Sequence, residues 1–106
     1  MTILVTGFEP FGSVSDNPSQ RIVEHLAKRN DLPLKTVVLP VAYAEAAEKI
    51  INLIEAYQPQ AVLMLGVAQS RKEICLERIA ININDARLAD NTGNINKIDA
   101  EINGLF

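Results

Sequence analysis

Three short apolar runs alternate along this sequence with two longer segments in which apolar residues recur every three or four positions. The runs cover residues 2–5, 34–39 and 61–65, and each is closed within two residues by a glycine or a proline. The first run is typical of a strand that is covered on both faces, the second is rich in β-branched residues and the third is apolar, so the three runs predict three strands. Residues 73 to about 83 alternate between polar and apolar types and predict a fourth strand.

The two longer segments predict helices. The first begins with Asn17, which can cap a helix, and Pro18, whose fixed φ suits the first turn, and its apolar stripe extends to about Arg29. Gln20 is placed to reach back to the cap. The second helix covers about residues 42–57. Strands and helices in this order predict an α/β fold with a largely parallel sheet and functional loops at the carboxyl ends of its strands.

Composition narrows the class of protein. The chain has 106 residues, 48% of them hydrophobic, and nothing resembling a linker divides it, so residues 1–106 are expected to form one unit. Its net charge of −3, with lysine and arginine scattered, argues against nucleic acid as a partner. We expect no membrane association and a cytoplasmic location, because there is neither a signal peptide nor an apolar run of ~20 residues. Cys75 is the single cysteine, which excludes an internal disulfide and a structural zinc site, and we expect no metal or other cofactor.

The stretch TGFEPFG, residues 6–12, lies between the first predicted strand and the first helix, where an α/β protein usually binds its ligand. Gly7 and Gly12 have the glycine spacing of a phosphate-binding loop. However, Ser13 and Val14 follow where that loop requires a lysine and a hydroxyl residue. A nucleotide-binding domain is therefore a disfavoured alternative, which a failed titration with ATP or GTP would eliminate.

The aromatic residues of the same stretch indicate another kind of site. Phe8, Pro10 and Phe11 could wall a small apolar pocket whose polar partners are backbone amides and Asn17. Packing of the two phenylalanines in the core beneath a long loop explains the same residues equally well.

The predicted fourth strand carries an acidic residue among apolar ones. Regular alternation places Glu77 on the same side as Cys75, Ile79 and Ile81. A carboxylate on a buried face needs a histidine, an arginine or backbone donors beside it. A solvated edge or a bulge that shifts the register explains the pattern without such a partner. Arg87, beyond the strand, is explained on composition alone by a surface ion pair.

These stretches together carry a resemblance to a known family. TGFEPFG, the Asn17-Pro18 pair, LPVAY at residues 39–43 and ERIAININDARLADNTG at residues 77–93 resemble the N-terminal half of pyroglutamyl peptidase I, also called pyrrolidone-carboxylate peptidase. The resemblance extends from Ile3 to about Gly93. It implies a three-layer α/β/α sandwich around a largely parallel, mixed sheet. It also implies a cytosolic cysteine peptidase that removes N-terminal pyroglutamate from peptides without a metal and commonly forms homotetramers.

The resemblance also assigns roles to particular residues. The family's catalytic glutamate corresponds to Glu77, and its arginine near the oxyanion site corresponds to Arg87. Phe8 and Phe11 would help to wall the pocket for the lactam ring of the pyroglutamyl peptide substrate, and Asn17 would stabilise that loop. The family's catalytic set is a glutamate, a cysteine and a histidine.

The family's cysteine and histidine lie in its C-terminal half, and this sequence, which stops at Phe106, has no counterpart of either. We expect this chain to be inactive alone, as a fragment or truncated gene product. The alternative is a binding module that retains the pocket without the chemistry. A dyad of Cys75 and His25 is disfavoured, because Cys75 is most simply a small buried hydrophobe and His25 a solvated helix residue. Unpaired strand edges and exposed apolar surface would favour a homo-oligomer.

Overall fold

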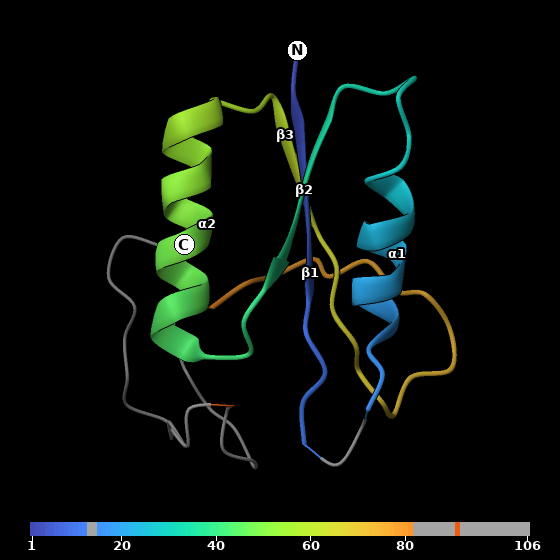
Figure 1. Ribbon diagram of the computed structural model, residues 1–106. Coiled ribbons are helices and arrows are strands. Elements are labelled where there is room, and N and C mark those ends of the chain that lie inside the picture. The colour runs from blue at the N-terminus through green and yellow to red at the C-terminus, as the bar shows by residue number, and fades with distance from the viewer. Residues whose placement is uncertain (13–14, 82–90, 92–106) are drawn as a thin grey trace.

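A computed structural model describes residues 1–12, 15–81 and 91 of the chain. Within them the chain forms, in order, strand β1 (Ile3–Phe8), helix α1 (Pro18–Leu26), strand β2 (Leu34–Leu39), helix α2 (Tyr43–Tyr57) and strand β3 (Ala61–Met64). The strands make one parallel sheet in the order β2-β1-β3 (Figure 1). Alternating strands and helices around a parallel sheet confirm the α/β fold predicted from the sequence.

The two helices lie on opposite sides of the sheet (Figure 1). Helix α1 packs against β1 and β2, and α2 packs against β2. The most buried apolar side chains, those of Leu4, Val5, Val23 and Leu39, come from β1, α1 and the end of β2. β1 is the central strand, and a helix lies on each face of the sheet, which explains why its apolar run is continuous. Neither helix is long and apolar enough to cross a bilayer in the part of the chain described.

Gly7 allows α1 to lie directly against the central strand. A Cβ atom at this position would stand 2.6 Å from the carbonyl oxygen of Ser19 and 2.8 Å from a methyl carbon of Val23. Both distances are too short for any side chain, so only glycine fits between this strand and this helix. The close approach joins the carboxyl end of β1 to the first turn of α1.

Two boundaries differ from those predicted by more than one residue. β1 extends to Phe8, so the first three residues of TGFEPFG belong to the strand and not to the loop. Gly7 was expected to close the strand, but here it serves packing against α1. Helix α1 ends at Leu26, earlier than the predicted Arg29.

The predicted fourth strand is absent from residues 73–81, and the rest of its predicted span lies outside the described residues. Alternation shows which side chains would share a face, but a strand also needs a backbone partner and a layer that covers its apolar side. Neither is supplied by the described residues. Ile74, Leu76 and Ile79 are therefore 80–101% exposed.

Candidate functional site

The loop after β1 begins at the carboxyl edge of the sheet. The side chains of Phe8, at the end of the strand, and Phe11, in the loop, are both partly buried. The Glu9 amide donates to the carbonyl oxygen of Leu39 at 3.1 Å, which continues the pairing with β2 by one residue. Gly12 has a φ of +62°, a left-handed conformation that glycine adopts readily. The two aromatic residues thus lie at the edge where parallel sheets usually bind ligands.

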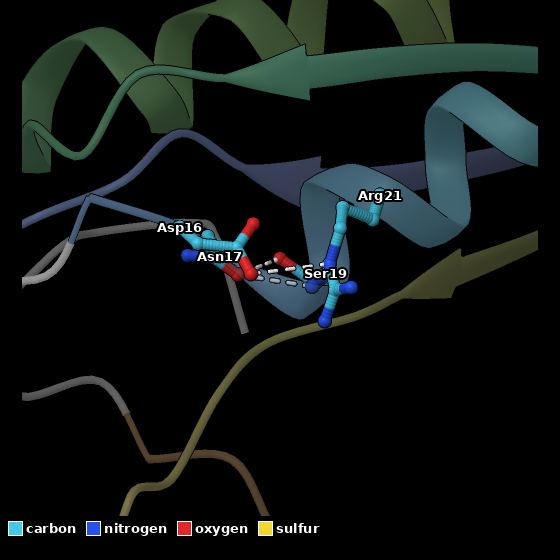
Figure 2. Close-up of polar contacts among 4 residues, drawn as sticks. All are labelled: Asp16, Asn17, Ser19 and Arg21. Carbon is cyan, nitrogen blue, oxygen red and sulfur yellow. Dashed lines mark hydrogen bonds and ion pairs between the residues drawn. The ribbon is translucent and has the colours of Figure 1, made fainter.

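Asn17 connects this loop to helix α1 and is only 2% exposed. Figure 2 shows its side chain beside Ser19: Asn17 Oδ1 accepts from the Ser19 amide at 3.0 Å and from the Ser19 hydroxyl at 2.7 Å. Ser19 Oγ in turn accepts from the Phe8 amide at 2.9 Å, and Asn17 Nδ2 donates to the Glu9 carbonyl oxygen at 3.1 Å. Asn17 is therefore the helix cap that the sequence predicted, and the Nδ2 group of the same side chain fixes the loop.

Ser19 was not recognised in the sequence as part of this arrangement. Gln20 was predicted to reach back to the cap with its side chain, whereas the bond observed is from its backbone amide to the Asn17 carbonyl oxygen at 3.0 Å, as in any first helical turn. A serine two residues after a capping asparagine was the available signal, because its hydroxyl can both donate to the cap and accept from the preceding strand. Asp16 and Arg21, also drawn in Figure 2, form an ion pair at 3.2 Å whose side chains are both more than half exposed.

Glu9 is a second connection that the sequence did not reveal. Its Oε1 atom accepts from the Val41 amide at 3.0 Å and from Asn91 Nδ2 at 2.8 Å. Asn91 also donates from Nδ2 to the Pro10 carbonyl oxygen at 3.0 Å, and its amide donates to the Val41 carbonyl oxygen at 2.7 Å. The pKa of the Glu9 carboxyl is lowered, first by the Asn91 side chain and then by the Val41 amide. The only local sign of this role in the sequence is that Glu9 is a charged residue between two phenylalanines.

Glu77 lies on the exposed segment and not on a buried face. Its carboxylate forms an ion pair with Arg71, and 70% of its side chain is exposed. The pKa of Arg71 is raised by this hydrogen bond and by the negative charge of Glu77. Of the two interpretations that the sequence left open, a buried carboxylate or a solvated edge, the exposed one is observed here: no apolar layer covers the segment within the described residues, and Arg71 is the cationic partner of the carboxylate. Arg87 lies outside the described residues.

Cys75 and His25 show no sign of a dyad. The Cys75 side chain is exposed, and its Sγ lies 3.5 Å from the carbonyl oxygen of Glu73, so the prediction of a buried cysteine is wrong. His25 is exposed in the last turn of α1, as predicted. Among the described residues, no three histidine, cysteine, aspartate or glutamate side chains gather where they could hold a metal ion.

A parallel sheet with helices on both sides defines an α/β protein, and its aromatic loop lies at the carboxyl end of the central strand, the edge where such proteins usually bind ligands. A sequence model described as pyroglutamyl peptidase matches residues 1–104. The chain belongs to the pyroglutamyl peptidase family, which confirms the resemblance seen in its motifs.

Individual relatives agree with this membership. The pyrrolidone-carboxylate peptidase of Fusobacterium nucleatum is 44% identical over 93 residues, which are 87% of this chain and 44% of that protein. The crystal structure of pyrrolidone carboxyl peptidase from Fervidobacterium islandicum AW-1 matches with a TM-score of 0.88 and 37% identity, over 94% of this chain and 49% of that one. The enzyme of the same name from Pyrococcus furiosus matches with a TM-score of 0.86 and 39% identity, over the same shares. The chain thus spans about half the length of these relatives.

Proposed function

We propose that this chain supplies the substrate pocket and the orienting glutamate of a cysteine peptidase that removes N-terminal pyroglutamate from peptides. The observation that carries the proposal is the Phe8–Phe11 loop at the carboxyl end of β1, which the buried side chain of Asn17 fixes to helix α1. Family membership supplies the chemistry that this loop serves.

The pocket suits the proposed substrate. The N-terminal pyroglutamyl residue is itself a small neutral lactam ring, which requires apolar walls and a few directed hydrogen bonds. Phe8 and Phe11 are the proposed walls. Because the Phe8 amide is already bonded to Ser19, the backbone of this wall is fixed before any substrate arrives. A pocket that is formed in advance loses less conformational entropy on binding.

The reaction needs groups from elsewhere. A cysteine nucleophile requires a histidine to generate its thiolate, and the histidine requires an orienting carboxylate, for which we propose Glu77. Arg87 is the proposed residue that stabilises the oxyanion in the transition state. We propose that the nucleophile and the histidine come from a complementary segment, that this chain is inactive alone, and that the assembled enzyme is a cytoplasmic homo-oligomer.

The test compares the chain alone with the chain plus a complementary segment. The part of the Fusobacterium nucleatum relative that this chain does not match provides that segment. The chain alone should release no product from a pyroglutamyl arylamide, and adding the segment should restore turnover. The proposal fails if the isolated chain hydrolyses the substrate and Cys75→Ser abolishes that activity.

A second function, binding without catalysis, is supported by one observation. The hydrogen bonds that connect Phe8, Glu9, Asn17 and Ser19 are all made within this chain. The proposed pocket wall therefore does not depend on the complementary segment. A binding module predicts that the isolated chain binds a pyroglutamyl peptide in calorimetry and that Phe11→Ala abolishes the binding. It also predicts no turnover after the complementary segment is added.

A further inference from the structure

Three parts of the chain meet at the carboxylate of Glu9. They are the loop after β1, the connection between β2 and α2 at Val41, and the single residue Asn91. Glu9 is 32 residues from Val41 and 82 residues from Asn91, so no local folding preference brings these groups together. We propose that Glu9 is a positioning residue that, with Asn91, clamps the Phe8–Phe11 loop and thereby sets the affinity of the pocket for the pyroglutamyl ring. The statement about affinity rests on the proposed function.

The clamp forms a closed set of hydrogen bonds. Glu9 Oε1 accepts from the Val41 amide, and the Val41 carbonyl oxygen accepts from the Asn91 amide. The side-chain amide of Asn91 uses its two hydrogens on Glu9 and on the Pro10 carbonyl oxygen. The loop after β1, Val41 and Asn91 are therefore each bonded to both of the others. A displacement of any one of them breaks at least one of these hydrogen bonds.

The position of the clamp relates it to the pocket. Glu9 and Pro10 are the two residues between Phe8 and Phe11, and each takes part in a bond to Asn91. Asn17 donates to the carbonyl oxygen of the first of these residues, Glu9. The backbone between the two aromatic walls is thus bonded both to the cap of α1 and to Val41 and Asn91.

Charge strengthens these bonds. The carboxyl of Glu9 is ionised near neutral pH, as an ordinary glutamate is, and its lowered pKa extends this into more acidic solution; hydrogen bonds to an ionised acceptor are stronger than those between neutral groups. Lys49 of α2 adds a weaker favourable charge interaction. Replacement of Glu9 by alanine removes the acceptor of two N–H groups, whereas glutamine retains one side-chain oxygen without the charge.

The first test measures the clamp on the chain itself, without any need for activity. In Glu9→Ala, hydrogen exchange at the Val41 amide should accelerate by about tenfold or more, because the amide loses a charged acceptor. Glu9→Gln should lie between Glu9→Ala and the unsubstituted chain. Glu48→Ala removes an equal charge from an exposed position of α2 and should leave this exchange unchanged. Equal Val41 exchange in Glu9→Ala and the unsubstituted chain would overturn the clamp.

The position of the aromatic walls can be followed separately. The chain has three phenylalanines, so fluorinated phenylalanine gives few resonances, which single substitutions can assign. In Glu9→Ala and in Asn91→Ala the resonances of Phe8 and Phe11 should shift or broaden, and in Glu48→Ala they should not. Unchanged resonances in both clamp variants would show that Glu9 does not position the loop.

The kinetic test uses the chain assembled with the complementary segment. Glu9→Ala should raise KM by about tenfold while kcat changes by less than about twofold, since the ring is bound in the ground state and in the transition state alike. A merely structural defect would instead reduce the amount of active enzyme, lowering kcat at constant KM. The double variant Glu9→Ala/Asn91→Ala should have the same KM as Glu9→Ala, because both act through one clamp. If the unsubstituted assembly shows no turnover, the proposed function fails, and the exchange and fluorine measurements still decide the clamp.

Discussion

Two regions of this chain differ sharply in how they are held. The carboxyl ends of β1 and β2 and the start of α1 are connected by hydrogen bonds between segments, and Leu4, Val5 and Asn17 are 2% exposed or less. In contrast, residues 68–81 are all exposed and contain no helix or strand. The first region contains the proposed pocket, and the second contains Glu77.

Under the proposed function, binding and catalysis depend on these two separate parts of the protein. The pocket loop obtains its hydrogen bonds within this chain and should keep its conformation without a partner. The segment around Glu77 has apolar side chains but no layer over them among the described residues, so its arrangement depends on what covers it. Substitutions in the two regions should therefore act on different measurable properties.

The largest expected effect is on turnover of the assembled enzyme. Glu77→Gln should reduce kcat roughly 100- to 10,000-fold, because it removes the charge that stabilises a histidine cation in the transition state. Arg87→Ala should reduce kcat by a comparable factor. Because the Glu77 side chain is 70% exposed, thermal unfolding of the chain alone should not change. A kcat within a few-fold of the unsubstituted enzyme would remove Glu77 from the proposed catalytic set.

The largest expected effect on stability is at Gly7. Gly7→Ala places a methyl group 2.6 Å from the Ser19 carbonyl oxygen, which is backbone and cannot rotate away. The free energy of unfolding in urea should fall by about 3 kcal/mol, as overpacking between rigid elements usually costs. Gly66→Ala is the matched control, since nothing lies within 4 Å of its added methyl group. Equal losses at both glycines would contradict the close packing of α1 on β1.

Local sequence pattern predicted most of the fold, because strands and helices here follow from apolar periodicity. β2 begins and ends where the apolar run does, at Leu34 and Leu39. The pattern was least accurate where packing between elements determines which residue is present. Glycine normally weakens a strand, yet β1 continues through Gly7, where α1 approaches too closely for any side chain.

The candidate site was less predictable for a related reason. Asn17 was found because a capping residue acts on its own helix, within a few residues. The bonds from Glu9 to Val41 and Asn91 join distant segments, and no local spacing encodes them. The alternation around Glu77 indicated which side chains share a face, but it contained no information about what would cover that face.

Asn17 and Asp16 are adjacent in sequence but differ in burial. Asn17→Ala leaves both the hydroxyl and the backbone amide of Ser19 without their acceptor. The free energy of unfolding should therefore fall by about 1–3 kcal/mol. Asp16→Ala breaks an ion pair that is more than half exposed and should cost less than about 1 kcal/mol. Similar losses for the two variants in urea unfolding would show that the cap does not hold the loop.

The smallest expected effect is the pH dependence of the Glu9 clamp. The folded chain lowers the pKa of Glu9 below its ordinary value of 4.5, through Asn91, the Val41 amide and Lys49. A carboxyl with a lowered pKa contributes stability above its unfolded pKa, and this contribution is lost as the pH falls through the folded value. The difference in unfolding free energy between the unsubstituted chain and Glu9→Gln should therefore be constant from about pH 7 to 5 and should shrink in more acidic solution. Other carboxyls titrate in both proteins and cancel in this difference. A difference that stays constant down to pH 3 would mean that the charge of Glu9 contributes nothing to the clamp, leaving only its hydrogen-bonding oxygen.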